Sequence, residues 1–263
     1  MVKEAGILEL INVGISFGGL QAVKKVSFRV QPGEIKALIG PNGAGKTTLF
    51  NLITGMLTPD RGEILFQQQA IQGLPPFRIA ARGISRTFQI VQLFPHMTVL
   101  ENVMVGRHVR TRSGLLSAAL RLPQGRREEA AIRAAGLAWL DFVGLQPRAN
   151  DSAGNLPLGH QRLLEIARAL ATDPKLLLLD EPAAGLDMTE TDRLKDLIFA
   201  IRDRGISVLL VEHDMSLTMD VADHIVVLDH GDLLAEGTPR QIQRHPAVIA
   251  AYLGSDWEKE PRP

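Results

Sequence analysis

Short apolar runs, separated by glycine and proline turns, alternate along the chain with segments of helical spacing. Residues 7–13 and 23–30 alternate between apolar and polar positions, which predicts two strands of an antiparallel or mixed sheet joined by a turn at 17–19. Residues 176–179 are four leucines, too short a run for a buried helix. Such a run is typical of a central parallel strand that is buried on both faces. Further strands are expected at 35–39, 63–66, 206–211, 225–228 and 233–235.

Helical spacing covers several of the intervening segments. We expect helices at 128–143, at 162–171, which ends at an Asp-Pro step, and at 189–204, which ends at Gly205. Thr98 and Glu101 have the spacing of a capping box, which indicates another helix start. The pattern predicts one α/β domain over residues 7–254, with a helical lobe inserted at about 95–155 and a flexible polar tail at 255–263.

Composition narrows the class of protein. The 263 residues suit one large α/β domain with a small inserted lobe. Basic and acidic residues number 29 each, so net charge gives no indication of a nucleic-acid partner. The absence of cysteine excludes disulfides and cysteine-ligated metals. No run approaches the roughly 18 apolar residues that cross a bilayer, so we expect a soluble, cytoplasmic chain whose membrane function, if any, needs separate membrane subunits.

A glycine-rich segment follows the predicted strand at 35–39 and fits Gly-x4-Gly-Lys-Thr without a gap. A strand, a glycine turn and a helix start together direct backbone N–H groups and the positive helix end at one point, where phosphate binds. Lys46 can reach the β- and γ-phosphates, and the Thr47 hydroxyl can ligate Mg²⁺. The predicted phosphate loop comprises Gly40, Pro41, Asn42, Gly43, Ala44, Gly45, Lys46, Thr47 and Thr48.

Charged side chains follow two other predicted strands. Asp180 and Glu181 come directly after the four leucines, and His213 follows the strand at 206–211. One strand–helix–strand crossover separates these positions, so all three side chains should emerge at the same edge of the sheet, where ligands bind. The alternatives are a helix N-cap or a surface acid pair for the carboxylates, and a plain surface residue for the histidine.

Taken together, these motifs resemble the ATP-binding subunits of ABC transporters over about residues 7–254. The phosphate loop resembles Walker A, Gln89 the Q-loop, residues 176–181 Walker B, residues 184–187 the D-loop and His213 the switch histidine. The resemblance implies a P-loop NTPase (RecA-like) core with an N-terminal antiparallel β-subdomain and an inserted α-helical subdomain. It also implies that ATP and Mg²⁺ are bound, and that ATP is hydrolysed.

The resemblance assigns roles to individual residues. Glu181 would orient or deprotonate the attacking water, and His213 would contact the γ-phosphate. Thr47 and Gln89 would reach Mg²⁺, and Asp180 would hold a metal-bound water. Taken alone, an aromatic residue beside a turn is more often a packing residue, but Phe17 falls where the family stacks an aromatic ring on adenine.

The signature segment departs from the family pattern. Members usually read Leu-Ser-Gly-Gly-Gln, whereas this chain has Pro157 at the serine position, followed by Leu158, Gly159 and His160. Proline cannot donate the serine hydroxyl to the γ-phosphate, and losing such a charged hydrogen bond weakens the contact roughly ten- to hundred-fold. The resemblance implies that these three residues complete the ATP site of a partner subunit. His160 is equally consistent with a plain surface residue.

Within the family, several segments look most similar to the ATPase of bacterial branched-chain (hydrophobic) amino acid importers, namely 86–89, 93–103, the arginine-rich insertion at 107–127 and the ending at 245–254. Importers of urea or short amides and the lipopolysaccharide-export ATPase share much of this pattern. A soluble ABC ATPase is a further alternative, although the chain lacks tandem ATPase domains. The importer resemblance implies a second ATP-binding subunit, identical or different, and two permease subunits, with a solute-binding protein as an indirect partner. It implies no nucleic-acid partner, and it places the chain on the inner face of the bacterial cell membrane. The arginine-rich insertion is either a contact with acidic loops or headgroups or a solvated hairpin.

Overall fold

The computed structural model describes residues 5–108 and 123–253, and two β-sheets organise this part of the chain. The first sheet is antiparallel, with order β2-β1-β4-β5. Its strands are β1 (Leu8–Phe17), β2 (Leu20–Val30), β4 (Arg61–Phe66) and β5 (Gln69–Ala70). The predicted turn between the first two strands is confirmed, because Gly18 and Gly19 both have positive φ there.

The second sheet has order β10-β9-β3-β8-β7-β6, with β10 antiparallel to β9 and the remaining pairs parallel. Its strands are β3 (Ile35–Ile39), β6 (Ile84–Arg86), β7 (Leu176–Asp180), β8 (Ser207–Val211), β9 (His224–Asp229) and β10 (Asp232–Gly237). Alternate leucines of β7 belong to different core clusters, Leu177 and Leu179 to one and Leu176 and Leu178 to the other. The four leucines therefore form a strand buried on both faces, as predicted.

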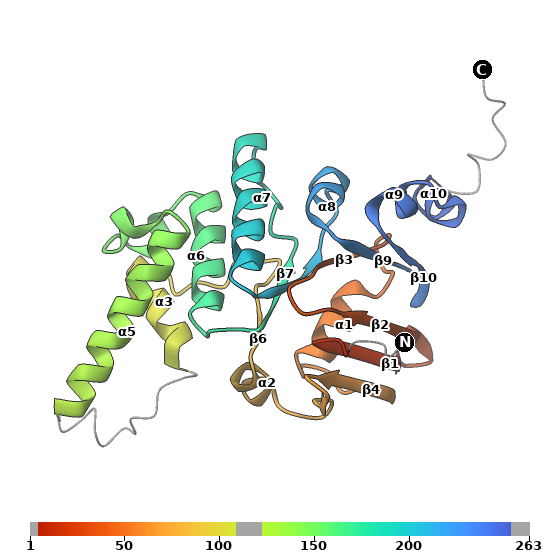
Figure 1. Cartoon of the computed structure of the whole chain (residues 1–263), viewed down its shortest axis with the longest axis horizontal. Coiled ribbons are helices and arrows are strands. Elements are labelled where there is room, and N and C mark those ends of the chain that lie inside the picture. The colour runs from red at the N-terminus through yellow and green to blue at the C-terminus, as the bar shows by residue number, and fades with distance from the viewer. Residues whose placement is uncertain (1–4, 109–122, 254–263) are drawn as a thin grey trace.

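Helices cover the sheets and form a lobe at one end of the molecule (Figure 1). The lobe contains α3 (Val99–Arg107) and α5 (Pro123–Phe142), and α6 (Leu158–Leu170) packs against both. The predicted capping box starts α3, where the Thr98 Oγ1 accepts the Glu101 N–H at 3.1 Å and the Glu101 carboxylate accepts the Thr98 N–H at 2.8 Å. Most of the arginine-rich insertion and the expected tail lie outside the described residues.

The other helices are α1 (Lys46–Ile53), α2 (Pro76–Arg82), α7 (Met188–Asp203), α8 (Met215–Val221), α9 (Pro239–Gln243) and α10 (Pro246–Leu253), with short 3-10 turns at Gln146–Arg148 and Ala153–Asn155. Side chains of α1 share one core cluster with the antiparallel sheet and with one face of the parallel sheet. The carboxyl ends of β3, β7 and β8 meet at a single edge of that sheet. This edge carries the phosphate loop and the predicted acids and histidine.

Candidate active site

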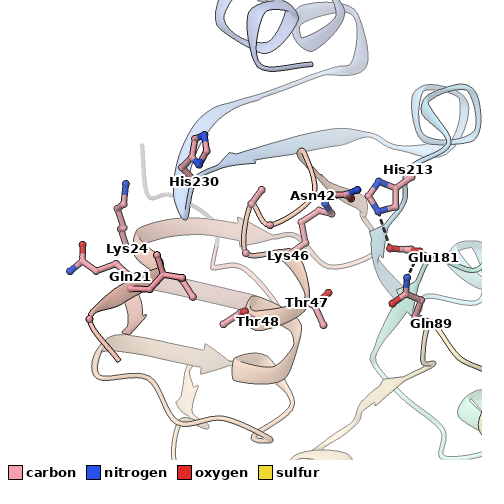
Figure 2. A pocket seen from close by; sticks show the side chains of 16 residues that line it. Gln21, Lys24, Asn42, Lys46, Thr47, Thr48, Gln89, Glu181, His213 and His230 are labelled. Atoms are coloured by element: carbon pink, nitrogen blue, oxygen red, sulfur yellow. Dashed lines mark hydrogen bonds and ion pairs between the residues drawn. The ribbon is translucent and has the colours of Figure 1, made fainter. Parts of the chain in front are cut away.

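A cavity of about 660 Å³ lies at this edge, and most of the predicted residues line it. In Figure 2 the cavity extends from Gln21, Lys24 and His230 at one end, past the phosphate loop, to Glu181 at the other. The sequence did not indicate Gln21, Lys24 or His230 as site residues, because they lie in a strand and in a turn that carry no recognisable motif. The lining comprises Gly19, Leu20, Gln21, Ala22, Lys24, Asn42, Gly43, Ala44, Gly45, Lys46, Thr47, Thr48, Gln89, Glu181, His213 and His230.

The phosphate loop has a shape that only glycine permits at two of its positions. Gly40, Gly43 and Gly45 all have positive φ. A Cβ at Gly40 would overlap the Leu228 carbonyl oxygen, and a Cβ at Gly45 would lie 2.6 Å from the Ala22 oxygen. Gly45 is also the N-cap of α1 and offers no capping side chain. The N–H groups of the first turn of this helix therefore remain available to an anion.

Lys46 folds back onto its own loop. Its Nζ donates to the carbonyl oxygens of Gly40 at 2.6 Å and Pro41 at 3.0 Å. Burial lowers the pKa of Lys46, and the nearby carboxylates of Glu181 and Asp180 oppose that shift. The charged lysine thus lies between neutral acceptors and two acids, and a phosphate would provide a stronger, charged acceptor at the same place.

Glu181 lies between two other predicted residues. Its Oε2 accepts a hydrogen bond from the Gln89 Nε2 at 2.7 Å, and its Oε1 lies 2.9 Å from the His213 Nε2 (Figure 2). The backbone of Glu181 has a φ of 47°, a left-handed conformation that costs of order 1–3 kcal/mol for a residue other than glycine. Its N–H bonds to the Val211 oxygen at 2.8 Å, which fixes it to the neighbouring strand. The structure thus brings the three predicted catalytic side chains together.

Asp180 lies beneath this cluster instead of on the cavity wall. Its carboxylate forms an ion pair with Arg86 at 2.7 Å, and both side chains are almost fully buried. Arg86 also donates to Asn51 in α1 at 2.7 Å and lies over the rings of Phe50 and Phe88. The sequence analysis named Arg86 only as part of a family motif and did not predict its ion pair. The partner, Asp180, is 94 residues away, so no local sequence pattern indicates the contact.

The adenine and signature residues lie apart from this cluster. Phe17 ends β1 and is 47% exposed, while Leu20, across the hairpin turn, lines the cavity. Leu158, Gly159 and His160 begin α6, and none of them lines the cavity. A Cβ at Gly159 would overlap the Glu190 carboxylate of α7. The Nδ1 of His160 is buried and has no hydrogen-bond partner in the part of the chain that the structure describes.

Among residues 5–108 and 123–253, no cluster of three or more histidine, cysteine, aspartate or glutamate side chains is placed to hold a metal ion. Within the same residues, no helix is both long and apolar enough to cross a bilayer.

Comparisons with known proteins agree with these observations. The model of the ABC transporter family matches residues 23–184, and a model described as branched-chain amino acid ATP-binding cassette transporter matches residues 233–258. The chain is 48% identical to the high-affinity branched-chain amino acid transport ATP-binding protein BraF of Pseudomonas aeruginosa, over 94% of this chain and 98% of BraF. It is 47% identical to LivG of Escherichia coli K12, a protein of the same description, over the same shares of the two chains.

Solved structures show the same similarity. The ADP conformation of MJ1267, an ATP-binding cassette of an ABC transporter, aligns with a TM-score of 0.83 at 33% identity, covering 95% of this chain and all of that one. A nucleotide-free ATP-binding cassette aligns with the same TM-score at 32% identity. The expected P-loop NTPase core is therefore confirmed, and the chain belongs to the ABC transporter family as an ATP-binding subunit, an ATPase coupled to transport.

Proposed function

We propose that this chain hydrolyses ATP to energise a bacterial importer of branched-chain, hydrophobic amino acids. The observation that carries the ATPase site is the contact of Gln89, Glu181 and His213 at one end of the phosphate-loop cavity. The solute is supported by BraF and LivG, whose names describe branched-chain amino acid transport. The family model at the C-terminal end of the chain supports the same solute.

The geometry suggests how each residue acts on ATP. The phosphates lie against the loop N–H groups, and Lys46 exchanges its two carbonyl partners for phosphate oxygens. Glu181 faces the γ-phosphate end and orients or deprotonates the attacking water, a role typically worth about 10²–10⁴-fold in rate. Gln89 and His213 hold one carboxylate oxygen each, so the direction of the carboxylate is fixed before water arrives. Phe17, which pairs across the hairpin turn with the cavity-lining Leu20, remains our candidate for stacking on adenine.

The residues present also fit a bound Mg²⁺. Thr47 and Gln89 line the cavity with neutral oxygens, and the described residues contain no acidic cluster that would form a complete cage. Mg²⁺ typically keeps waters and binds through substrate phosphates with one or two protein ligands. When bound, the ion supplies positive charge that offsets the charge on the phosphates. Thr47 and Gln89 would hold it directly, and Asp180, which is absent from the cavity lining, would hold one of its bound waters.

Two further surfaces support the proposed partners. Leu158 at the start of α6 and Met188 at the start of α7 are large, exposed apolar side chains. The two helix starts lie together, since Gly159 faces Glu190, and this surface suits contact with the ATP site of a second subunit. A groove of about 430 Å³ between the segment after β6 and the helical lobe includes Phe88 and Phe94, and we assign it to the permease subunits. These contacts would place the chain on the inner face of the cell membrane. A solute-binding protein would act on the permeases from the other side.

The proposal is tested with the complex purified from its own membranes and reconstituted with its solute-binding protein. We expect leucine, isoleucine and valine to stimulate ATP hydrolysis and to be taken up, with urea and short amides inactive. Glu181→Gln should abolish both activities while MgATP still binds. Stimulation by urea and not by leucine would overturn the solute, and a Glu181→Gln complex that hydrolyses ATP at the wild-type rate would overturn the catalytic assignment.

A further inference from the structure

Glu212 is a buried carboxylate that contacts both loops carrying the proposed catalytic side chains. It is 4% exposed and directly precedes His213. One carboxylate oxygen accepts the Ala183 N–H at 2.8 Å. The other accepts the N–H groups of His213 at 2.9 Å and Asp214 at 3.2 Å. Burial raises the pKa of Glu212, and these three hydrogen bonds oppose the shift.

These hydrogen bonds lie beyond the last pairing between β7 and β8, where backbone pairing no longer joins the loop after β7 to the loop after β8. Strands β7 and β8 pair as far as Asp180 and Val211, and the Glu181 N–H makes a further bond to the Val211 oxygen. Beyond that point Ala183 and Glu212 are 29 residues apart in sequence and are joined through the Glu212 side chain. Glu181, two residues before Ala183, has the left-handed backbone conformation, which persists only where the surroundings hold it.

We propose that Glu212 is a positioning residue for ATP hydrolysis. It fixes the loop after β7 to the loop after β8, so that Glu181 and His213 face the same water and γ-phosphate. The inference rests on the proposed roles of Glu181 and His213. Glu212 itself does not line the cavity, so it acts through the two loops and not on the nucleotide.

The change that tests this is Glu212→Gln in the assembled complex. Glutamine keeps one acceptor oxygen, so it loses either the Ala183 bond or the pair to His213 and Asp214. Because a displacement of about 1 Å can cost about 10²-fold in rate, we expect kcat to fall roughly 10- to 100-fold. The KM for ATP should stay close to the wild-type value, since the three hydrogen bonds of the Glu212 carboxylate go to Ala183, His213 and Asp214 and not to the phosphate loop.

A matched control is Glu34→Gln. Glu34 is also a buried carboxylate, 5% exposed, but it precedes β3 at the opposite edge of the sheet and contacts Lys36 and His224. This variant should change the melting temperature without lowering kcat. Glu212→Asp retains the charge on a shorter side chain, and it should recover part of the lost kcat and serve as the test if Glu212→Gln does not fold.

The decisive readout is a double-mutant cycle with His213→Ala. If Glu212 acts by positioning His213 and Glu181, adding Glu212→Gln to His213→Ala should lower kcat much less than it does in the wild-type background. Fully additive losses, a wild-type kcat, or a loss matched by the unfolded fraction would overturn the positioning role. A His213→Ala complex with wild-type activity would instead overturn the role of His213 on which the inference rests. A wild-type complex that leucine does not stimulate would overturn the proposed function, so the failures are distinguishable.

Discussion

The buried ion pair between Arg86 and Asp180 allows a quantitative prediction of how much unfolding free energy is lost when one partner is removed. Arg86→Met removes the guanidinium but keeps an apolar side chain about as long as the aliphatic stem of the arginine. Both charged side chains are almost fully buried, at 6% and 3% exposure, so the remaining carboxylate has little access to water. The same change removes the hydrogen bond to Asn51 and the contacts with the two neighbouring aromatic rings.

The magnitude follows from the loss of one partner of a buried pair. Leaving a buried charge without its partner costs about 3–5 kcal/mol. The contacts with the rings of Phe50 and Phe88, at 5.4 and 5.0 Å, belong to a type worth about 0.5–2 kcal/mol. These contributions overlap, so we expect a total of about 4 kcal/mol. At about 2–4 °C per kcal/mol for a chain of this size, the melting temperature should fall by about 8–16 °C.

Urea and thermal unfolding of the purified subunit, followed by circular dichroism, measure this change. Arg202→Met is the control, because Arg202 pairs with Asp203 on the surface and such pairs contribute about 0–1 kcal/mol. The double variant Arg86→Met, Asp180→Leu should recover much of the loss, since neither charge of the pair is then left buried without its partner. The reasoning is refuted if Arg86→Met lies within about 1 kcal/mol of the wild type, or if the double variant is less stable than Arg86→Met.

Three further outcomes are expected. Lys46→Met should abolish equilibrium binding of a fluorescent ATP analogue while leaving the fold intact by circular dichroism, because the phosphates lose their only lysine in the loop; tight binding by this variant would contradict its role. Gly40→Ala should destabilise the chain more than Gly43→Ala, because both have positive φ but only the first would overlap a neighbour, the Leu228 carbonyl; equal melting temperatures would contradict this. Burial raises the pKa of Glu165 above its ordinary 4.5, so the folded chain binds this proton more tightly than the unfolded chain. The wild type should therefore gain stability relative to Glu165→Gln as the pH falls from 7 toward the raised pKa of Glu165. Urea unfolding measures the difference in unfolding free energy between the two proteins, and the same difference at pH 7 and pH 5 would exclude the shift.

Patterns within a few residues predicted most of the core. The four leucines of β7 and the glycine spacing of the phosphate loop are local signals, and each predicts a structure that sterics and burial enforce. The proximity of Glu181 and His213 could also be predicted. A single crossover makes β8 pair in parallel with β7, so the residues that follow the two strands lie at the same edge of the sheet.

Contacts between segments far apart in sequence were not predictable in this way. Strand β6 has three residues, too few to show an apolar–polar alternation. Arg86, its last residue, forms an ion pair with Asp180, the last residue of β7. The role of Glu212 depends on backbone N–H groups, which every residue but proline offers, so no residue type marks its partners. Such contacts depend on the packed arrangement of strands, which sequence spacing alone does not specify.

Helix α6 joins two features that the sequence treats as separate motifs. It begins at Leu158 in the signature segment, and in its middle the buried Glu165 accepts the N–H groups of Phe88 and Gln92 at 3.3 Å each. Arg162, on the same helix, donates to the Phe88 carbonyl at 3.1 Å. These bonds hold the chain on both sides of Gln89, whose side chain contacts Glu181. We therefore expect a displacement of the signature segment, which begins this helix of 13 residues, to shift the loop that orients the proposed catalytic carboxylate.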